Sequence, residues 1–585
     1  MATPETSEAY KPAPDAEKPR GVSFKRLLIT MGACAAVGIG VQFITAINDN
    51  SIRNAISLLA SIFAIVGFAV WVYRAIAISS PRLIAFFVTI CMLAIPAVLF
   101  RIRGFSGEII PQIEFRFAGE RQVRTEPISL GDQSTDIDIA DAGHLAPTAF
   151  SQFLGSQRNA IVQRREFEVP KSAAEMKVLW RQPIGEGWSG FAITGGRCIT
   201  LEQRGTQECV TCYRLADGEL LWIHSETARH ENPLGGIGPR SMPTIVGDRV
   251  YTQGATGIVN CLELATGKPI WRRELLNIAG WDAKTSENAI NWGRSGSPLI
   301  IDGMCVLPLG GPGDIATSQS TDADDAASVK DAKINGRSLI ALDANDGTIR
   351  WTAGDDQISY ASPIQMTLAG VDQIVTVNEN TVQGHAIADG QVLWSTKWSG
   401  QSNGAANCSS AMQFGDNSFW IGKAYGEGSA LYEISTADSG LEVARRWKKP
   451  SVLKTKFTHP AIVGEFAYAL SDGTLECIRL ADAQRMWAQP RGARYGHGHL
   501  ILVEDVMVVQ TEPGDVAFVE VRSDKFEESL RVSALDSKSW NIPSIAGRYL
   551  AVRNDVEAIV YELPDRTSET EIAFATQPDE TDGKP

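Results

Sequence analysis

The stretch CYRLADGELLW, from Cys212 to Trp222, decides the fold because close copies of it recur along the chain. Each copy contains an apolar strand, a turn that usually carries Asp-Gly or Thr-Gly, and a second strand that ends in tryptophan. A repeat of this kind indicates many short antiparallel strands rather than helices. The other clear copies are CLELATGKPIW (Cys261–Trp271), LDANDGTIRW (Leu342–Trp351), HAIADGQVLW (His385–Trp394) and CIRLADAQRMW (Cys477–Trp487).

Weaker copies end at Trp447 and Trp540, and VLW at 178–180 resembles the closing half of one more. These eight tryptophans lie 42, 49, 80, 43, 53, 40 and 53 residues apart, and all intervals but one suit a four-stranded blade. The 80-residue interval contains residues 310–338, whose small, polar and acidic composition is typical of a surface loop. The sequence therefore predicts an all-β, eight-bladed β-propeller over residues 171–563.

The two ends of the repeat region complement each other. Residues 543–563 (PSIAGRYLAVRNDVEAIVYEL) supply inner strands with no outer strand after them, whereas the strand that ends at Trp180 has no inner strands beside it. Pairing these ends completes the eighth blade and leaves no open sheet edge. Residues 104–170 are interpreted as a connector, and residues 1–25 and 564–585 as disordered tails.

Three uncharged apolar stretches precede the propeller, at residues 27–47, 55–73 and 83–100. Each approaches the length that a helix needs to cross a bilayer, so residues 26–103 are predicted to contain three transmembrane helices. The alternatives are buried core helices or a signal peptide, but no small-residue cleavage site follows the first stretch. Lys and Arg are more frequent in the N-terminal tail than in the first loop, which predicts a cytoplasmic N-terminus and an extracytoplasmic propeller. The stretches contain no Asp, Glu, Lys or His, which favours an anchor over a transport path.

Composition excludes some functions. The formal net charge of −14 argues against a nucleic-acid partner, since a phosphate backbone would be repelled. The 44% hydrophobic and 21% charged residues are ordinary for a globular protein with a large core. Of the nine cysteines, Cys34 and Cys91 lie in the apolar stretches, and the odd number that remains does not suggest a disulfide framework.

The repeat also explains individual cysteines. Cys212, Cys261 and Cys477 occupy the position that Ala341 fills in another copy, which indicates a small residue packed inside a sheet. Cys209 and Cys212 are alternatively a redox pair or half of a zinc site. No second C-x-x-C follows at zinc spacing, and residues three apart on a strand face opposite ways.

The segments just before each inner strand are the candidate binding site, because function in a propeller usually lies in loops at one end of the central channel. If the blades are in register, their polar and aromatic side chains converge there. Such a set could bind an anion through Arg, Lys and His and stack a flat ring on Trp and Tyr. The alternative is that these residues hold the loops together by hydrogen bonds. The candidates are Trp188, Arg240, Trp292, Arg294, Tyr360, Asn407, Lys456, His459, His497, His499 and Asn541.

His497 and His499 also suggest a metal site, since residues two apart on a strand share a face. A third ligand is not evident in the sequence, so no metal is predicted. No Ser-His-Asp spacing, phosphate-binding glycine loop or metalloprotease motif occurs, so no catalytic residue is predicted either.

The repeat pattern A/C-x-x-L-A-D/T-G-x-x-x-W resembles the PQQ-like β-propeller repeat of quinoprotein alcohol dehydrogenases and of BamB-like outer-membrane assembly factors. Several segments are similar to membrane-anchored bacterial members of this family. These segments are SQFLGSQRNAIV (Ser151–Val162), LWRQPIGEGWSGFA (Leu179–Ala192), GGIGPRSMPTIVGDRVYTQGATG (Gly235–Gly257) and NWGRSGSPLI (Asn291–Ile300). The resemblance implies a location in the cytoplasmic membrane of a bacterium.

The same resemblance bears on chemistry. Quinoprotein dehydrogenases use an adjacent cysteine pair, a calcium ion held by acidic and amide side chains, and an aspartate base, but this chain has no Cys-Cys pair. Cys209-Val-Thr-Cys212 is followed by Tyr213, so the C-x-x-C-H haem motif is missing as well. The expectation is a non-catalytic binding or scaffold module for a protein or a small anionic ligand, with no cofactor. The alternative is an atypical oxidoreductase for alcohols or sugars, in which Arg240, Arg294 and the channel tryptophans would hold PQQ with calcium.

Overall fold

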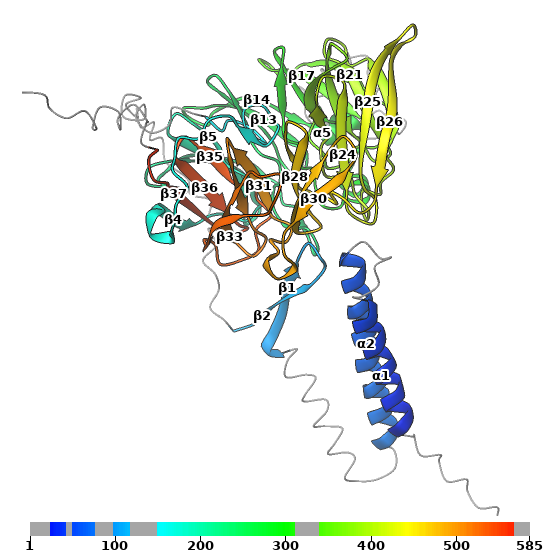
Figure 1. Cartoon of the computed structure of the whole chain (residues 1–585). Helices are drawn as coiled ribbons and strands as arrows, with labels where there is room; N and C mark the ends of the chain where they lie inside the picture. Colours follow the sequence, from blue (N-terminus) through cyan, green and yellow to red (C-terminus); the bar gives the residue numbers. More distant parts are fainter. Residues whose placement is uncertain (1–23, 42–49, 77–97, 118–148, 311–337, 567–585) are drawn as a thin grey trace, which may run out of the picture. The chain divides into compact units, whose positions relative to one another are not determined.

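The computed structural model describes residues 24–41, 50–76, 98–117, 149–310 and 338–566. By contacts the chain divides into two compact units, one with both helices and one with residues 102–113 and the propeller. The predicted tails and the acidic loop lie almost entirely outside the described residues. The bounds of both units' elements follow, with labels as in Figure 1.

The first unit contains two antiparallel apolar helices, α1 (Phe24–Gly40) and α2 (Asn50–Ile76). The Ser57 hydroxyl donates to the Gly38 carbonyl at 2.7 Å and joins them. Among the described residues only Arg53–Trp71 is long and apolar enough to cross a membrane, and Arg26–Gly40 is a shorter apolar helix. The third predicted span, 83–100, lies mostly outside the described residues, so the structure supports one spanning helix and does not establish a three-helix module.

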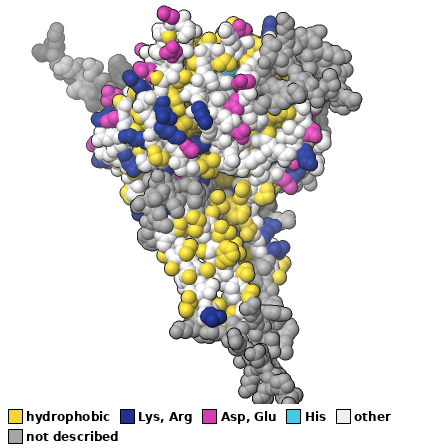
Figure 2. Space-filling view, turned by 90° about the vertical axis from the view of Figure 1, so that its right-hand side faces the viewer, with side chains coloured by type: hydrophobic (Ala, Val, Ile, Leu, Met, Phe, Trp, Pro, Cys, Tyr) yellow, Lys and Arg dark blue, Asp and Glu magenta, His cyan; other side chains and the backbone are white. Residues whose placement is uncertain are grey.

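The surfaces of the two units differ. Large apolar side chains such as Ile62, Phe63 and Val66 are between 47% and 67% exposed on α2. Figure 2 shows apolar side chains gathered over the helical part, whereas Lys, Arg, Asp and Glu are interspersed over the propeller. An exposed apolar helix surface is stable only against another apolar phase or partner, which agrees with the prediction of an anchor.

The described residues of the second unit form eight blades of four antiparallel strands each, here called blades 1 to 8. Seven blades use consecutive strands, one of them with an added parallel strand, and the eighth combines strands from both ends of the repeat region. The innermost strand of each blade is short, and the second and third strands are almost fully buried. Blade 1 contains β5 (Ala192–Thr194), β6 (Arg197–Arg204), β7 (Gln207–Arg214) and β8 (Leu220–Thr227), and blade 2 contains β11 (Thr244–Val246), β12 (Arg249–Gln253), β13 (Ile258–Glu263) and β14 (Pro269–Glu274). Blade 3 contains β15 (Leu299–Ile301), β16 (Met304–Pro308), β17 (Leu339–Asp343) and β18 (Ile349–Ala353), and blade 4 contains β19 (Ile364–Leu368), β20 (Val371–Val377), β21 (Thr381–Ala386) and β22 (Val392–Lys397).

Blades 5 to 7 follow the same order. Blade 5 contains β23 (Met412–Phe414), β24 (Ser418–Lys423), β25 (Gly428–Ala437) and β26 (Gly440–Lys449). Blade 6 contains β27 (Ala461–Val463), β28 (Phe466–Ser471), β29 (Thr474–Arg479) and β30 (Gln484–Ala488). Blade 7 contains β31 (His499–Val503), β32 (Val506–Gln510), β33 (Asp515–Glu520) and β34 (Glu528–Ser533). Smaller elements are β1 (Phe100–Phe105), β2 (Pro111–Phe115), β3 (Ile161–Val162), β9 (Glu231–Asn232), β10 (Gly236–Ile237), α5 (Leu275–Ala279), α6 (Ala283–Ala289), and 3-10 turns at Ala173–Glu175 and Arg491–Ala493.

Blade 8 joins the two ends of the propeller. Its first strands are β35 (Ser544–Ala546), β36 (Tyr549–Arg553) and β37 (Glu557–Glu562), and its outer strand is β4 (Lys177–Pro183). Trp180 on β4 lies opposite Val560 on β37. The predicted eight blades and the predicted closure are confirmed.

The outer strands carry seven tryptophans, which we call the closing tryptophans: Trp180, Trp222, Trp271, Trp351, Trp394, Trp447 and Trp487. The indole of Trp222 donates to the Leu264 carbonyl in the next blade at 3.0 Å. A Cβ on Gly267 would approach that indole to 2.4 Å, and Gly267 has φ +70°. The turn glycine therefore lets the backbone of blades 1 to 4 lie against the tryptophan of the preceding blade.

The prediction that Trp540 is a closing tryptophan is wrong. In blade 7 the position opposite Phe518 is occupied by Leu530 of β34. Trp540 follows β34 and lies in the loop before β35, where its indole donates to Glu512 Oε1 at 2.9 Å. Leu530 fills the closing position with an aliphatic side chain, so the spacing of tryptophans alone misassigned this residue.

The three cysteines of the repeat are packed inside the sheets, as the repeat predicts. Cys212, Cys261 and Cys477 lie directly opposite Trp222, Trp271 and Trp487 on the neighbouring strand. Every described cysteine is free, and burial raises the pKa of Cys261 to about 11. A small side chain there leaves room for the indole, and a thiol with so high a pKa stays protonated.

Residues 150–162, interpreted above as part of a connector, cross the central channel, and we call them the axial segment. The Ser151 carbonyl accepts from Ile245 of blade 2, and β3 pairs in parallel with β31 of blade 7. Arg158, buried to 3% exposure, donates to the carbonyls of Ser297, Pro298 and Pro363, which precede the inner strands of blades 3 and 4. A segment that touches the inner strands of blades on opposite sides of the ring must fill the channel between them.

Candidate functional site

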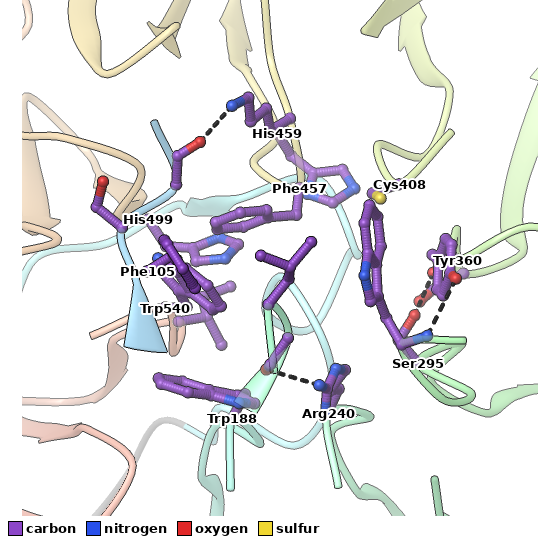
Figure 3. Close-up of a pocket in the computed structure, with 18 of the residues that line it drawn as sticks. Phe105, Trp188, Arg240, Ser295, Tyr360, Cys408, Phe457, His459, His499 and Trp540 are labelled. Atoms are coloured by element: carbon purple, nitrogen blue, oxygen red, sulfur yellow. Dashed lines mark hydrogen bonds between the residues drawn. The ribbon is translucent and has the colours of Figure 1, made fainter. Parts of the chain in front are cut away.

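A cavity of about 330 Å³ lies at the end of the channel where the loops before the inner strands meet, here called the mouth. Residues from all eight blades contribute to it, together with a β-hairpin tip and the axial segment, and Figure 3 shows the aromatic rings around it. Its volume is in the range of small-ligand pockets. The lining residues are Phe105, Ser106, Gly107, Ile109, Phe153, Trp188, Gly190, Leu234, Gly235, Arg240, Met242, Trp292, Ser295, Tyr360, Ser362, Asn403, Gly404, Cys408, Tyr425, Lys456, Phe457, His459, His499, Trp540 and Ile542.

Most of the site residues predicted from the sequence are brought together here. Six lie in the loop before an inner strand and His499 is the first residue of β31, so the shared register of the blades carries them to one place. Whether they bind a ligand remains a prediction. The residues that line the cavity are Trp188, Arg240, Trp292, Tyr360, Lys456, His459 and His499.

The remaining four predicted residues do not line the cavity. Arg294 is 2% exposed, donates to the Pro308 carbonyl at 3.1 Å and lies over the Trp281 ring. Asn407 donates to three backbone carbonyls, and Asn541 donates to those of Gly187 and Ser189. These three residues hold loops of the mouth together, which is the structural alternative weighed above.

The fourth residue, His497, has different surroundings from His499, although the two are only two positions apart in the sequence. His499 lines the cavity, whereas His497 is fully buried beside Asp472, with Nε2 3.7 Å from Asp472 Oδ1. Burial lowers the pKa of His497 to about 3 and that of His499 to about 4. Both rings are therefore neutral at pH 7, and the two do not form a shared pair of ligands.

The turn between β1 and β2 covers part of the mouth, and we call Phe105–Ile109 the tip. Lys538 Nζ donates to the Phe105 carbonyl at 2.9 Å, and Lys456 Nζ donates to the Gly107 carbonyl. The Gly107 amide donates to Glu512 Oε1. The mouth therefore holds the tip by its backbone groups.

Two charged side chains in these contacts are unusual. Burial lowers the pKa of Lys538 to about 8, and its ammonium lies 3.7 Å from the centre of the Trp540 ring. Burial alone would raise the pKa of Glu512, but hydrogen bonds from the amides of Gly107 and His497 and from the Trp540 indole help to lower it overall. Glu512 therefore stays an acceptor at neutral pH.

Arg240 and Lys456, the two predicted anion-binding residues with cationic side chains that line the cavity, already have acceptors. Arg240 donates to the carbonyls of Gly235 and Gly238, both at 2.7 Å, and burial lowers its pKa to about 10. Lys456 is bound to the tip, as described. These contacts favour an uncharged ligand over an anion, because an anion would have to compete for donors that are already used.

Three donors at the cavity have no acceptor within the described residues. They are Trp188 Nε1, Trp292 Nε1 and His459 Nδ1. His459 Nε2 accepts from the Ser410 amide at 2.8 Å, so the proton of this neutral ring is on Nδ1. Burial lowers the pKa of His459 to about 3, and its ring meets Phe153 of the axial segment edge-on at 5.3 Å. Trp398 and Trp420 also lack an acceptor, but neither lines the cavity.

Sequence reasoning missed several parts of the site. Phe457 and Cys408 lie inside segments that were singled out, but no pattern distinguished them from their neighbours. Trp540 was assigned to the outer ring. Lys538, Glu512 and the tip carry no repeat signal, and only the folded chain brings them together.

The residues of the mouth do not fit a calcium-bound quinone. None of the described residues that line the cavity is Asp or Glu, so a calcium ion and a catalytic base have no carboxylate there. Cys408 lines the cavity as a single thiol, and burial raises its pKa to about 12.

The fold is similar to known propellers at low sequence identity. BamB from Moraxella catarrhalis aligns with a TM-score of 0.45 and 11% identity over 66% of this chain and 100% of that one. A europium-containing methanol dehydrogenase aligns with a TM-score of 0.41 and 10% identity over 71% of this chain and 98% of that one. The quinohemoprotein alcohol dehydrogenase from Comamonas testosteroni aligns with a TM-score of 0.40 and 10% identity over 74% of this chain and 84% of that one. No match to a curated protein was found.

A protein-family comparison covers more of the sequence. The family model described as outer membrane protein assembly factor BamB matches residues 169–325 and 210–489, which together span more than half of the 585 residues. The match begins just before β4 and ends after β30, so it follows the repeat of closing tryptophans through blade 6. The chain therefore belongs to the family of outer membrane protein assembly factor BamB.

Proposed function

We propose that this protein is a membrane-tethered, non-catalytic binding module whose mouth binds an uncharged segment of a protein partner through an apolar side chain and backbone carbonyls. The observation that carries the proposal is the tip. Its Phe105 ring lines the cavity, while Lys538, Lys456 and Glu512 hold its backbone. The mouth thus already binds one peptide segment, from its own chain.

The free part of the cavity has the same chemistry as the part that the tip fills. Its walls are mainly aromatic and aliphatic, and its unpaired donors on Trp188, Trp292 and His459 suit carbonyl oxygens. An apolar side chain flanked by peptide carbonyls meets both requirements. The family description, an assembly factor for outer membrane proteins, agrees with a protein ligand rather than a metabolite.

The tether and its orientation are part of the proposal. The apolar segment Arg53–Trp71 supports anchoring, and the distribution of Lys and Arg supports a cytoplasmic N-terminus with an extracytoplasmic propeller. We expect alkaline phosphatase fused after Leu563 to be active in this orientation, and an inactive fusion would reverse the proposed topology.

A capped, uncharged peptide tests the mouth directly. We expect N-acetyl-Phe-Gly-Phe-amide to bind the detergent-solubilised full chain saturably in isothermal titration calorimetry. The double variant Trp188→Phe/Trp292→Phe keeps the rings but removes both N–H donors, so its affinity should fall about tenfold at roughly 0.5–1.5 kcal/mol per lost hydrogen bond.

Trp398→Phe is the matched control, since Trp398 also lacks an acceptor but lies outside the cavity. It should leave the affinity unchanged. The proposal fails if the peptide does not bind, or if Trp398→Phe weakens binding as much as the double variant.

A further inference from the structure

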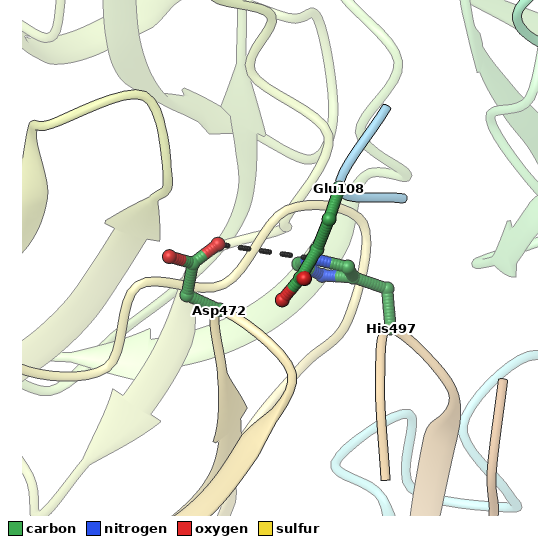
Figure 4. A group of neighbouring side chains, drawn as sticks. All are labelled: Glu108, Asp472 and His497. Atoms are coloured by element: carbon green, nitrogen blue, oxygen red, sulfur yellow. Dashed lines mark ion pairs between the residues drawn. The ribbon is translucent and has the colours of Figure 1, made fainter. Parts of the chain in front are cut away.

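A second group of side chains lies beside the tip, outside the lining of the cavity. It contains Glu108 of the tip, Asp472 in the turn between β28 and β29 of blade 6, and His497 just before β31 of blade 7. One ligand atom from each lies within 4.8 Å of the other two. Figure 4 shows Glu108 and Asp472 beside the His497 ring. Three separate parts of the chain therefore meet around one point.

His497 is the residue that most needs a partner. Its ring is fully buried, and neither ring nitrogen has a hydrogen-bond partner among the described residues. Asp472 Oδ1 lies 3.7 Å from Nε2, which is too far for a hydrogen bond. A buried polar group left in this state costs about 1–3 kcal/mol, so a bound species at this place would stabilise the fold.

The backbone of the tip is shaped to reach His497. A Cβ on Gly107 would lie 2.4 Å from His497 Cδ2, so only glycine allows this approach. It places the next residue, Glu108, against the same ring. The Glu108 side chain is 12% exposed and also binds Arg494.

We propose that Glu108, Asp472 and His497 bind one divalent transition-metal ion, which fastens the tip to blades 6 and 7. One imidazole nitrogen with two carboxylates suits Zn²⁺ better than Mg²⁺ or Ca²⁺, which prefer oxygen ligands only. Zn²⁺ needs ligand atoms about 2.0–2.2 Å from the ion, so a small closure of the three side chains completes the site. The site differs from the predicted pair of His497 and His499, because only the first is a ligand.

Neighbouring cations limit the affinity of this site. Lys454 Nζ lies 3.3 Å from Asp472 Oδ2, and Arg494 binds Glu108. A bound ion would share both carboxylates with these groups, so binding is expected to be weaker than at a closed structural zinc site. The site is independent of what the cavity binds, since none of its ligands lines the cavity.

The experiment uses the full chain in detergent, freed of metal with EDTA and titrated with ZnCl₂. We expect one Zn²⁺ per chain by calorimetry and by elemental analysis after gel filtration. Backbone hydrogen exchange of residues 102–113 should slow when Zn²⁺ is added, because the ion holds the tip in place. Glu108→Gln should abolish both effects while keeping an oxygen acceptor for Arg494, and His497→Ala should do the same.

His224→Ala is the matched control. His224 Nε2 lies 3.2 Å from Glu226 Oε1 on the outer strand of blade 1. The variant therefore removes another histidine beside a carboxylate, and it should leave Zn²⁺ binding and the slowed hydrogen exchange intact. If His497→Ala does not fold, Glu108→Gln decides, because its side chain comes from the tip. Absence of Zn²⁺ binding, or binding that survives Glu108→Gln, overturns the proposal and indicates water or an adventitious ion at His497.

Discussion

The same residue, tryptophan, occupies two regions of this propeller with different outcomes. At the outer ring, the closing tryptophan Trp222 is 5% exposed and donates to a carbonyl of the next blade. At the mouth, Trp188 is 7% exposed, but its indole nitrogen has no acceptor among the described residues. Burial does not distinguish the two positions, whereas the hydrogen-bond partner does.

This difference separates residues that hold the blades together from residues available to a ligand. A closing tryptophan fills the wedge between blades and uses its polar atom in the same contact. At the mouth, Trp188 and Trp292 contribute their rings to the cavity wall while their indole N–H donors have no acceptor among the described residues. Trp540, at the same cavity, donates to Glu512. The identity of a residue in the repeat therefore says less about its role than the partner of its polar atom.

The largest expected effect is a loss of stability when a closing tryptophan of the outer ring is removed. Trp222→Ala removes a buried ring and its hydrogen bond, so we expect the free energy of unfolding to fall by about 3–5 kcal/mol. Trp188→Ala should cost roughly 1–2 kcal/mol, because its ring already borders open space. Urea unfolding of the full chain in detergent, followed by circular dichroism, measures both. Equal losses would show that the mouth ring is as structural as the outer one.

An intermediate effect is the dependence of the free energy of unfolding on pH, which we expect from Glu208 in blade 1. Glu208 lies at the start of β7, accepts from the Ala255 amide, and burial raises its pKa to about 7 from an ordinary 4.5. Below pH 4.5 the carboxyl is protonated in both the folded and the unfolded chain. Between pH 4.5 and 7 only the unfolded chain loses the proton, so the free energy of unfolding falls with pH, by up to about 3 kcal/mol in total.

Glu208→Gln removes this dependence and keeps an oxygen for the Ala255 amide. Its advantage over the natural chain should therefore grow between pH 5 and pH 8, measured by thermal unfolding. Glu287→Gln, at an exposed site, serves as the control and should show no such trend. A constant difference between the two proteins across this range would mean that Glu208 is ionised in the fold.

The smallest expected effect returns to the outer ring and tests why cysteine faces a closing tryptophan. Cys261→Ala should cost less than about 1.5 kcal/mol, because Ala341 occupies the equivalent position opposite Trp351. Cys261→Leu should cost about 1–3 kcal/mol by overpacking against Trp271. Unfolding midpoints compare the two variants. A larger loss for alanine than for leucine would show that volume, rather than space for the indole, matters there.

The outer ring was predictable from the sequence because its contacts repeat. A turn glycine, a small residue and a tryptophan recur at fixed offsets, so each copy supports the others. The same regularity led to the error at Trp540, since a tryptophan at a plausible interval looked like another copy. In blade 7 Leu530 takes that position, and no repeat signal marks an aliphatic substitute.

The mouth was predictable only in outline. The loops before the inner strands were expected to converge, and seven of the predicted residues line one cavity. The partners that decide their chemistry were not predictable, because Lys538 meets Phe105 across more than 400 residues of chain. Single contacts of this kind leave no periodic pattern, and one sequence contains no record of them.

The closure of blade 8 by β4 has a consequence for the order in which the molecule assembles. The first strand of the propeller stays without its partner until β37 has been made, at the far end of the repeats. In equilibrium terms the long loop costs little, since each doubling of its length adds about 0.6 kcal/mol. In kinetic terms it makes ring closure a late step. The axial segment precedes β4 in the chain, so it has to be gathered in as the blades accumulate, and the ring closes around a piece of chain synthesised before any blade.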